Sequence, residues 1–146
     1  MKDEMSAFDI LAMTSEMQML VGGYLDKIFH WDGRNVLLRI NTPSAGRREL
    51  VLQDLRWLYI SPERPEMPDI PSQFAVHLRK ILTNGRISSV RQREFDRVVV
   101  IELEKGPAAF QIVIELFGGG NLIVTTEGKI VGSVVSRKGR HREKRP

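Results

Sequence analysis

The chain has 146 residues, of which 42% are hydrophobic and 27% are charged, proportions that suit one compact domain with its own core. It contains no cysteine, which excludes a disulfide framework and any thiolate nucleophile or metal ligand. No apolar run approaches the roughly 20 residues that cross a bilayer, and the acidic N-terminus is unlike a signal peptide. We therefore expect a cytoplasmic protein without a membrane partner.

Positive charge is concentrated at the C-terminal end. The net charge is +4, but residues 137–145 hold six basic side chains against one acidic, which leaves 16 basic and 17 acidic side chains in residues 1–136. This predicts a near-neutral domain over 1–136 and a basic tail over 137–146 that leads to downstream domains absent from this chain. The tail is either a solvated linker or an RNA contact through four of its cations, Arg137, Lys138, Arg140 and Arg142.

A first helix is predicted from Ser6, which can cap its N-terminus, to the Gly22-Gly23 pair that ends it. Apolar residues recur at spacings of three and four along it, and form one face: Ile10, Met13, Met17 and Leu20. Methionine fills irregular gaps in cores, so this face is predicted to be buried and not to form a ligand pocket.

Four strands are expected next, over residues 24–31, 36–40, 50–52 and 57–60, with a hairpin turn at Asp32-Gly33. Four prolines in residues 61–71 exclude a regular element there, so this segment is predicted to be a crossing loop. Ser72 then caps a second helix, which Asn84-Gly85 ends.

The remainder of the chain is predicted to be strands, over residues 87–90, 98–103, 110–117, 122–126 and 130–135. Both faces of the middle strands are apolar, so we expect them to be buried on both sides. The order of helix, four strands, helix and five strands indicates an α+β fold, an antiparallel β-sandwich or pseudobarrel with two packed helices.

No pattern of catalytic or metal-binding residues is present. The three histidines, His30, His77 and His141, lie far apart without local partners, and no serine stands in a nucleophile elbow. The glycines at 118–120 are flanked by predicted strands and not followed by a helix, so a hairpin turn is expected in place of a phosphate loop. The sequence thus predicts no catalytic residue, no metal and no cofactor, and a protein that is not an enzyme.

An unusual group of four arginines is predicted to lie around a tight turn at residues 94–96: Arg86, Arg91, Arg93 and Arg97. Guanidinium groups pair bidentately with phosphate oxygens, so this group is a candidate phosphate clamp. The alternative is an ordinary turn in which Asp96 bonds nearby backbone amides and the arginines form surface ion pairs.

Several segments together resemble the N-terminal NFACT domain of the ribosome-associated quality-control factors, a family once named fibronectin-binding protein A. They run almost from end to end of the chain, in the expected order: residues 8–10, 21–28, 81–87, 90–92, 95–99, 115–122 and the basic tail. The opening at residues 5–9 resembles archaeal more than bacterial members.

This resemblance implies a module that binds tRNA and the large ribosomal subunit holding a stalled peptidyl-tRNA, and that supports C-terminal alanine tailing of the nascent chain. It assigns tRNA engagement to Asp96 and Arg97, and we expect Arg91, Arg93 and Arg86 to add phosphate contacts. Asp96 could act directly or by orienting Arg97. Which tRNA binds, whether the isolated domain binds RNA, and the oligomeric state are left open by the sequence.

Two alternatives accompany this hypothesis. The domain is similar in fold to the N-terminal domain of formamidopyrimidine-DNA glycosylases, which suggests a base-excision protein. Those enzymes use a proline after the initiator methionine as nucleophile, whereas this chain has Lys2. The older family name suggests a fibronectin-binding surface adhesin, which the missing secretion signal disfavours.

Overall fold

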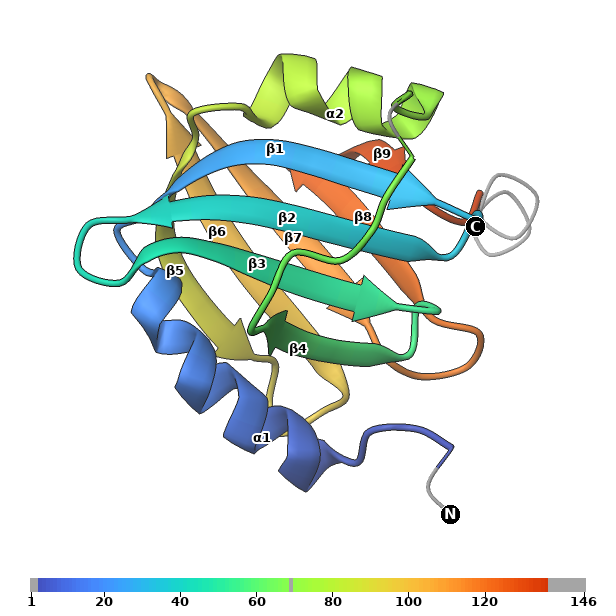
Figure 1. Ribbon diagram of the computed structural model, residues 1–146. Coiled ribbons are helices and arrows are strands. Elements are labelled where there is room, and N and C mark those ends of the chain that lie inside the picture. The colour runs from blue at the N-terminus through green and yellow to red at the C-terminus, as the bar shows by residue number, and fades with distance from the viewer. Residues whose placement is uncertain (1–2, 69, 137–146) are drawn as a thin grey trace.

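The computed structural model describes residues 3–68 and 70–136, so the predicted tail and Lys2 lie outside the described residues. The expected order of helix, four strands, helix and five strands is confirmed in this part of the chain (Figure 1). The elements are α1 (Ala7–Glu16), the short 3-10 helix η1 (Met17–Leu20), β1 (Tyr24–Trp31), β2 (Asn35–Thr42), β3 (Gly46–Gln53), β4 (Trp57–Ser61), α2 (Gln73–Leu82), β5 (Arg86–Gln92), β6 (Val98–Lys105), β7 (Ala108–Glu115), β8 (Asn121–Thr126) and β9 (Lys129–Ser133).

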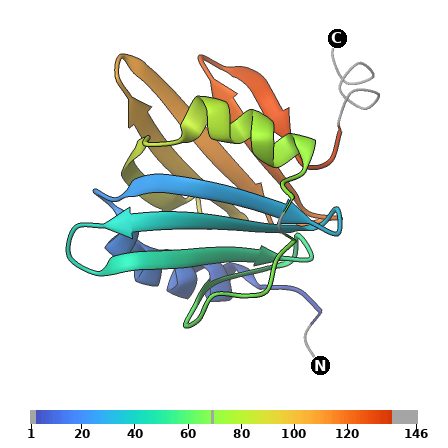
Figure 2. The same cartoon turned by 45° about the horizontal axis from the view of Figure 1, so that its top comes forward.

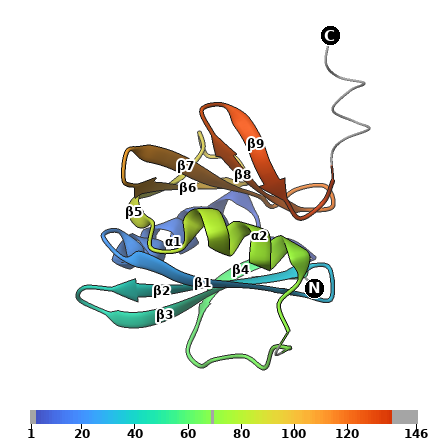
Figure 3. The same cartoon turned by 90° about the horizontal axis from the view of Figure 1, so that it is seen from above.

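All nine strands of the described residues belong to one antiparallel sheet, in the order β4-β3-β2-β1-β5-β6-β7-β8-β9. The sheet folds over at the junction of β1 and β5, so that β1–β4 form one layer and β5–β9 the other (Figures 1 and 3). Gly23 and Gly85 lie at this corner, where Leu25 donates to the Gly85 carbonyl and Ile87 donates to the Gly23 carbonyl. The predicted sandwich is therefore one continuous sheet bent into two layers.

The two helices lie over the two open sides of the sandwich. Helix α2 packs on β1 and β9, and α1 packs on β5 and β6 on the opposite side (Figures 1 and 2). Ser6 and Asp9 form the full capping box at the start of α1, with Ser6 Oγ accepting from the Asp9 amide at 3.1 Å and Asp9 Oδ2 accepting from the Ser6 amide at 2.8 Å. The predicted apolar face is confirmed as core, because Ile10 of α1 and Met17 and Leu20 of η1 are fully buried.

The main core fills the space between the layers, and a second, smaller cluster lies on the far side of the β6–β8 strands. Val99 and Ile101 belong to the first cluster, whereas Val98 and Val100 belong to the second. The expectation that the middle strands are buried on both faces is thus confirmed. In the part of the chain that the structure describes, no helix has the length and apolar character of a membrane-crossing segment.

The glycines at 118–120 form the predicted turn between β7 and β8, and this turn joins the two layers a second time. Arg34 donates through Nη2 to the Gly119 carbonyl at 2.7 Å and through Nε to Asp54 Oδ1 at 2.8 Å. Gly120 has a φ of +82°, and a Cβ there would lie 2.0 Å from the Leu55 carbonyl oxygen. Glycine at this position therefore permits the close approach of the β3–β4 turn.

Strand β3 begins four residues earlier than the sequence predicts. Its ladder with β2 starts at the pair Thr42 and Gly46 and continues through Arg47 to Glu49. The residues from Gly46 to Glu49 do not alternate between apolar and polar, so the sequence pattern missed them, but backbone pairing does not require such alternation. Arg39 and Glu49, which face each other in this ladder, form a buried ion pair at 3.3 Å.

Candidate nucleic-acid interface

The predicted arginine-rich turn connects β5 to β6 and is held firmly at both ends. The Arg93 amide donates to the Val98 carbonyl at 2.9 Å, and the Asp96 amide donates to the Arg93 carbonyl at 2.7 Å. Glu94 and Phe95 adopt positive φ values of 44° and 53° between these bonds. Both residues lie in the left-handed region, which turns the chain sharply and projects their side chains into solvent.

Gln92 attaches this turn to the N-terminus of α1. Its Nε2 donates to the Asp96 carbonyl at 2.8 Å and to the Ala7 carbonyl at 3.0 Å. The aromatic rings of Phe8 and Phe95 meet edge to face, with 4.9 Å between their centroids. Both rings remain largely exposed, Phe8 by 72% and Phe95 by 50%, so the junction presents an apolar patch to solvent.

Asp96 and Arg97 lie side by side at the end of this turn but do not form a pair with each other's side chains. Asp96 Oδ1 accepts from the Arg97 backbone amide at 3.3 Å, as the ordinary-turn alternative predicts for this carboxylate. The Arg97 guanidinium reaches Glu4, with 2.7 Å between Nη1 and Oε2, and the arginine side chain is 33% exposed. Asp96 therefore supports the backbone from which Arg97 projects, and Glu4 holds the guanidinium.

The other three arginines occupy different places. Arg93 lies in the turn itself and is exposed. Arg91 lies on the opposite face of the β5–β6 ribbon from Arg97, because it pairs with Val100, whereas Gln92 and Val99 face α1 and the main core. Arg86 starts β5, roughly 20 Å from the turn at about 3.3 Å per residue, so the expectation that it lies around the turn is wrong.

The two arginines that lie outside the turn, Arg91 and Arg86, each have a carboxylate nearby. Arg91 lies 3.8 Å from Glu102, and Arg86 lies 3.9 Å from Glu104. Hydrogen bonds from Gln111 and Ser89, together with the positive charge of Arg91, hold the pKa of Glu102 below its ordinary value, against the opposing effect of burial. Glu102 therefore stays ionised and offsets the charge of Arg91 at neutral pH.

The histidines of the described residues make structural contacts. His30 Nδ1 lies 2.9 Å from Ser72 Oγ, and His77 Nε2 lies 2.8 Å from the Val131 carbonyl oxygen. Within residues 3–68 and 70–136, no group of three or more histidine, aspartate or glutamate side chains could hold a metal ion. His141 and the basic tail residues Arg137, Lys138, Arg140 and Arg142 lie outside the described residues.

Two members of the site were missed in the sequence. Glu4 and Phe8 lie almost 90 residues before the turn that they contact. No periodicity connects residues so far apart. The one available signal is Phe8, two residues after the Ser6 cap, because a large apolar side chain outside the predicted apolar face needs a reason to stay in solvent.

Known proteins similar to this chain are factors of ribosome quality control. The archaeal Rqc2 homolog aRqcH of Methanocaldococcus jannaschii is 40% identical over 129 residues, which cover 84% of this chain and 19% of that protein. Ribosome quality control complex subunit 2 of Saccharomyces cerevisiae is 32% identical over 132 residues, which cover 88% of this chain and 12% of that protein. This chain therefore spans less than a fifth of the length of these two relatives.

The fold is also that of a solved bacterial domain. The N-terminal domain of fibronectin-binding protein PavA from Streptococcus pneumoniae matches with a TM-score of 0.80 and 25% identity, over 88% of this chain and 53% of that one. A family model described as the NFACT N-terminal and middle domains matches residues 6–146. The chain therefore belongs to the NFACT N-terminal domain family.

Proposed function

We propose that this chain is the RNA-binding N-terminal module of a ribosome-associated quality-control factor, and that the β5–β6 turn contacts tRNA. Relatives named as ribosome quality control complex subunits in archaea and yeast support the general role. The observation that supports the contact site is the Arg97 guanidinium, held by Glu4 at the end of a turn that is fixed by backbone hydrogen bonds and carries the exposed ring of Phe95.

Arg97 and the aromatic patch supply complementary parts of an RNA contact. A guanidinium binds phosphate oxygens through charge-assisted hydrogen bonds. Phe8 and Phe95 offer exposed ring faces, on which unpaired bases stack. Because sequence-specific RNA recognition mostly targets loops with splayed bases, the arrangement favours a loop of a folded RNA over a regular duplex.

In this proposal Asp96 is a positioning residue. Its carboxylate accepts from the Arg97 amide, and its negative charge would repel a phosphate and not attract it. Arg93 adds a second exposed cation on the same turn. Arg91 and Arg86 contribute less, because Arg91 lies on the opposite face of the β5–β6 ribbon and Arg86 lies at the far end of β5. Binding to the large subunit, cytoplasmic location and alanine tailing belong to the whole factor and are proposed on the names of its relatives.

The test is tRNA binding by Arg97→Ala, measured by filter binding in a salt series. We expect affinity to fall about ten-fold, which is the loss of one charged hydrogen bond. The slope of log K against log salt should decrease by about 1, because one phosphate contact is lost. Arg47→Ala removes an exposed arginine from β3, far from the turn, and should change neither quantity.

Equal affinities for Arg97→Ala and the unaltered chain would remove the turn from the RNA site. An affinity loss of the same size in Arg47→Ala would show that binding depends on total charge and not on this turn. The adhesin alternative, which the name of the pneumococcal protein supports, is tested in parallel by titrating fibronectin. Fibronectin binding that survives Arg97→Ala without any tRNA binding would favour that alternative.

A further inference from the structure

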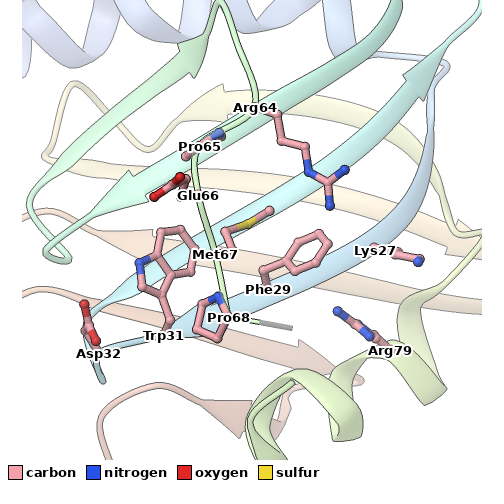
Figure 4. A pocket seen from close by; sticks show the side chains of 10 residues that line it. All are labelled: Lys27, Phe29, Trp31, Asp32, Arg64, Pro65, Glu66, Met67, Pro68 and Arg79. Carbon is pink, nitrogen blue, oxygen red and sulfur yellow. The ribbon is translucent and has the colours of Figure 1, made fainter. Parts of the chain in front are cut away.

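A hollow of about 880 Å³ lies on the outer face of the β1–β4 layer, on the side away from the core. The proline-rich loop between β4 and α2 crosses this face and forms one wall, β1 forms the floor and Arg79 of α2 closes one end (Figures 1 and 4). Ile28 lies in the core, so alternation along β1 directs Lys27, Phe29 and Trp31 outward, and a bulge between Leu25 and Lys27 lets Leu25 face the core as well. The size is that of small-molecule sites.

Charge in this hollow is segregated. Lys27, Arg64 and Arg79 stand around Phe29 on one side, whereas Asp32 and Glu66 stand around Trp31 on the other (Figure 4). Among the residues that the structure describes, the side chains of Lys27 and Arg64 form no ion pair or hydrogen bond. Cations that have no carboxylate partner among the described residues repel one another, so this end of the hollow favours an anion.

The cationic end is fixed in place. Arg79 Nε donates to the Ile28 carbonyl at 2.8 Å, and the Arg79 guanidinium lies 5.0 Å from the centre of the Phe29 ring. Arg39 approaches the same ring at 4.8 Å. The Arg39 side chain is 5% exposed, and its Nη2 atom has no hydrogen-bond partner within the described residues. Glu49 offsets the charge of Arg39 at 3.3 Å, so Arg39 supports the Phe29 ring and leaves one buried donor unused.

From these observations we propose that the hollow binds a nucleoside phosphate. The phosphate lies between Lys27, Arg64 and Arg79, where guanidinium groups can donate to its oxygens. The base stacks on Trp31, whose ring stands at the acidic end of the hollow (Figure 4). The ligand is a free nucleotide or one unpaired nucleotide of an RNA, and in the second case the inference rests on the proposed function.

The acidic end sets the base preference. Asp32 and Glu66 can accept hydrogen bonds from amino groups on the base edge. Cytosine presents an amino donor where uracil presents a carbonyl acceptor, and the two rings are equal in size. The carboxylates attract the cytosine amino group and repel the uracil oxygen, so the site should prefer CMP to UMP.

The test is a fluorescence titration with Trp31 as the probe. The chain has two tryptophans, Trp31 and Trp57, so Trp57→Phe leaves a single reporter in the hollow. CMP should quench this fluorescence, with UMP, cytidine and inorganic phosphate each binding at least several-fold more weakly. Absence of quenching by CMP at millimolar concentration, or equal binding of UMP or of phosphate alone, would overturn the inference.

Variants locate the ligand. Arg64→Ala alters an exposed loop side chain and should weaken CMP binding about ten-fold, the effect of one lost charged hydrogen bond. Lys129→Ala removes an exposed cation from β9, outside the hollow, and should leave CMP binding unchanged. Far-UV circular dichroism confirms that both variants fold. Unchanged CMP affinity in Arg64→Ala contradicts the assignment.

Two further arms identify the source of the nucleotide and separate this site from the turn. A cytidine oligoribonucleotide that binds more tightly than CMP identifies RNA as the ligand, and equal binding identifies the free nucleotide. Arg97→Ala should leave CMP binding intact. If Arg64→Ala abolishes CMP binding but leaves tRNA binding normal, the nucleotide site in the hollow is supported independently of the turn. If CMP causes no quenching while tRNA binding depends on Arg97, the nucleotide site is refuted and the tRNA contact at the turn stands.

Discussion

If the β5–β6 turn binds RNA as proposed, Glu4 competes with RNA for Arg97, and its removal should strengthen binding. The two side chains lie 2.7 Å apart and are 33% and 55% exposed, which places the pair among partly solvated salt bridges. Such pairs contribute about 0.2–1 kcal/mol. If Arg97 must exchange Glu4 for a phosphate, RNA binding includes the free energy cost of breaking the Arg97–Glu4 pair. Glu4→Gln removes this cost, and tRNA affinity rises by up to about five-fold.

The assay is the same filter-binding titration, at low and at physiological salt. The gain should shrink as salt increases, because screening weakens the exposed pair. Asp3→Asn is the matched control, since it removes an acidic charge next to Glu4 that makes no ion pair with the described residues. An equal gain in Asp3→Asn would mean general repulsion and not competition at Arg97. The reasoning is refuted if Glu4→Gln leaves affinity unchanged while Arg97→Ala lowers it.

Two stability predictions follow from other contacts. Gly120→Ala should lower the free energy of unfolding in urea by about 3 kcal/mol, because it adds strain at positive φ and a clash with the Leu55 carbonyl. Gly128→Ala adds the same strain, but a Cβ there has no atom within 4 Å, so it should cost about 1 kcal/mol. Glu102→Gln should lower stability at pH 7 by less than about 1 kcal/mol, because the folded-state pKa of Glu102 lies below its ordinary 4.5. This loss should persist above pH 4.5 and disappear as the pH falls through the lowered pKa, since protonated Glu102 no longer differs from glutamine in charge; equal losses at pH 7 and pH 3 would contradict it.

Local signals in the sequence were sufficient for the order of elements. Ser6 and Ser72 do cap the two helices, and the Asp32-Gly33 turn does join β1 to β2. Each of these signals works within four residues, so tertiary packing has little chance to override it. The strand ends were predicted less well, because the ladder at Gly46 depends on backbone pairing with β2 and not on side-chain pattern.

The candidate site required long-range information. Asp96 and Arg97 were identified through the family resemblance, but their surroundings depend on the N-terminus, which returns to the β5–β6 turn only after folding. In the sequence both Arg86 and Arg97 flank the predicted turn, but Arg86 lies at the far end of β5, a strand of seven residues. The hollow over β1 combines a strand, a loop and a helix, so no single segment of sequence could reveal it.

The distribution of charge indicates that the proposed RNA recognition depends on where individual arginines lie and not on the total charge of the domain. Residues 1–136 carry 16 basic and 17 acidic side chains, so the domain body attracts a polyanion only weakly at long range. Several of its arginines are also offset locally, as Glu102 offsets Arg91 and Glu104 offsets Arg86. Arg97 differs in its partner, because Glu4 lies before the first helix and outside any strand, whereas Glu102 and Glu104 are residues of β6. A carboxylate outside regular secondary structure can leave its guanidinium without disturbing a strand, which is why the turn, and not the arginines of β5, is the stronger candidate for the RNA contact.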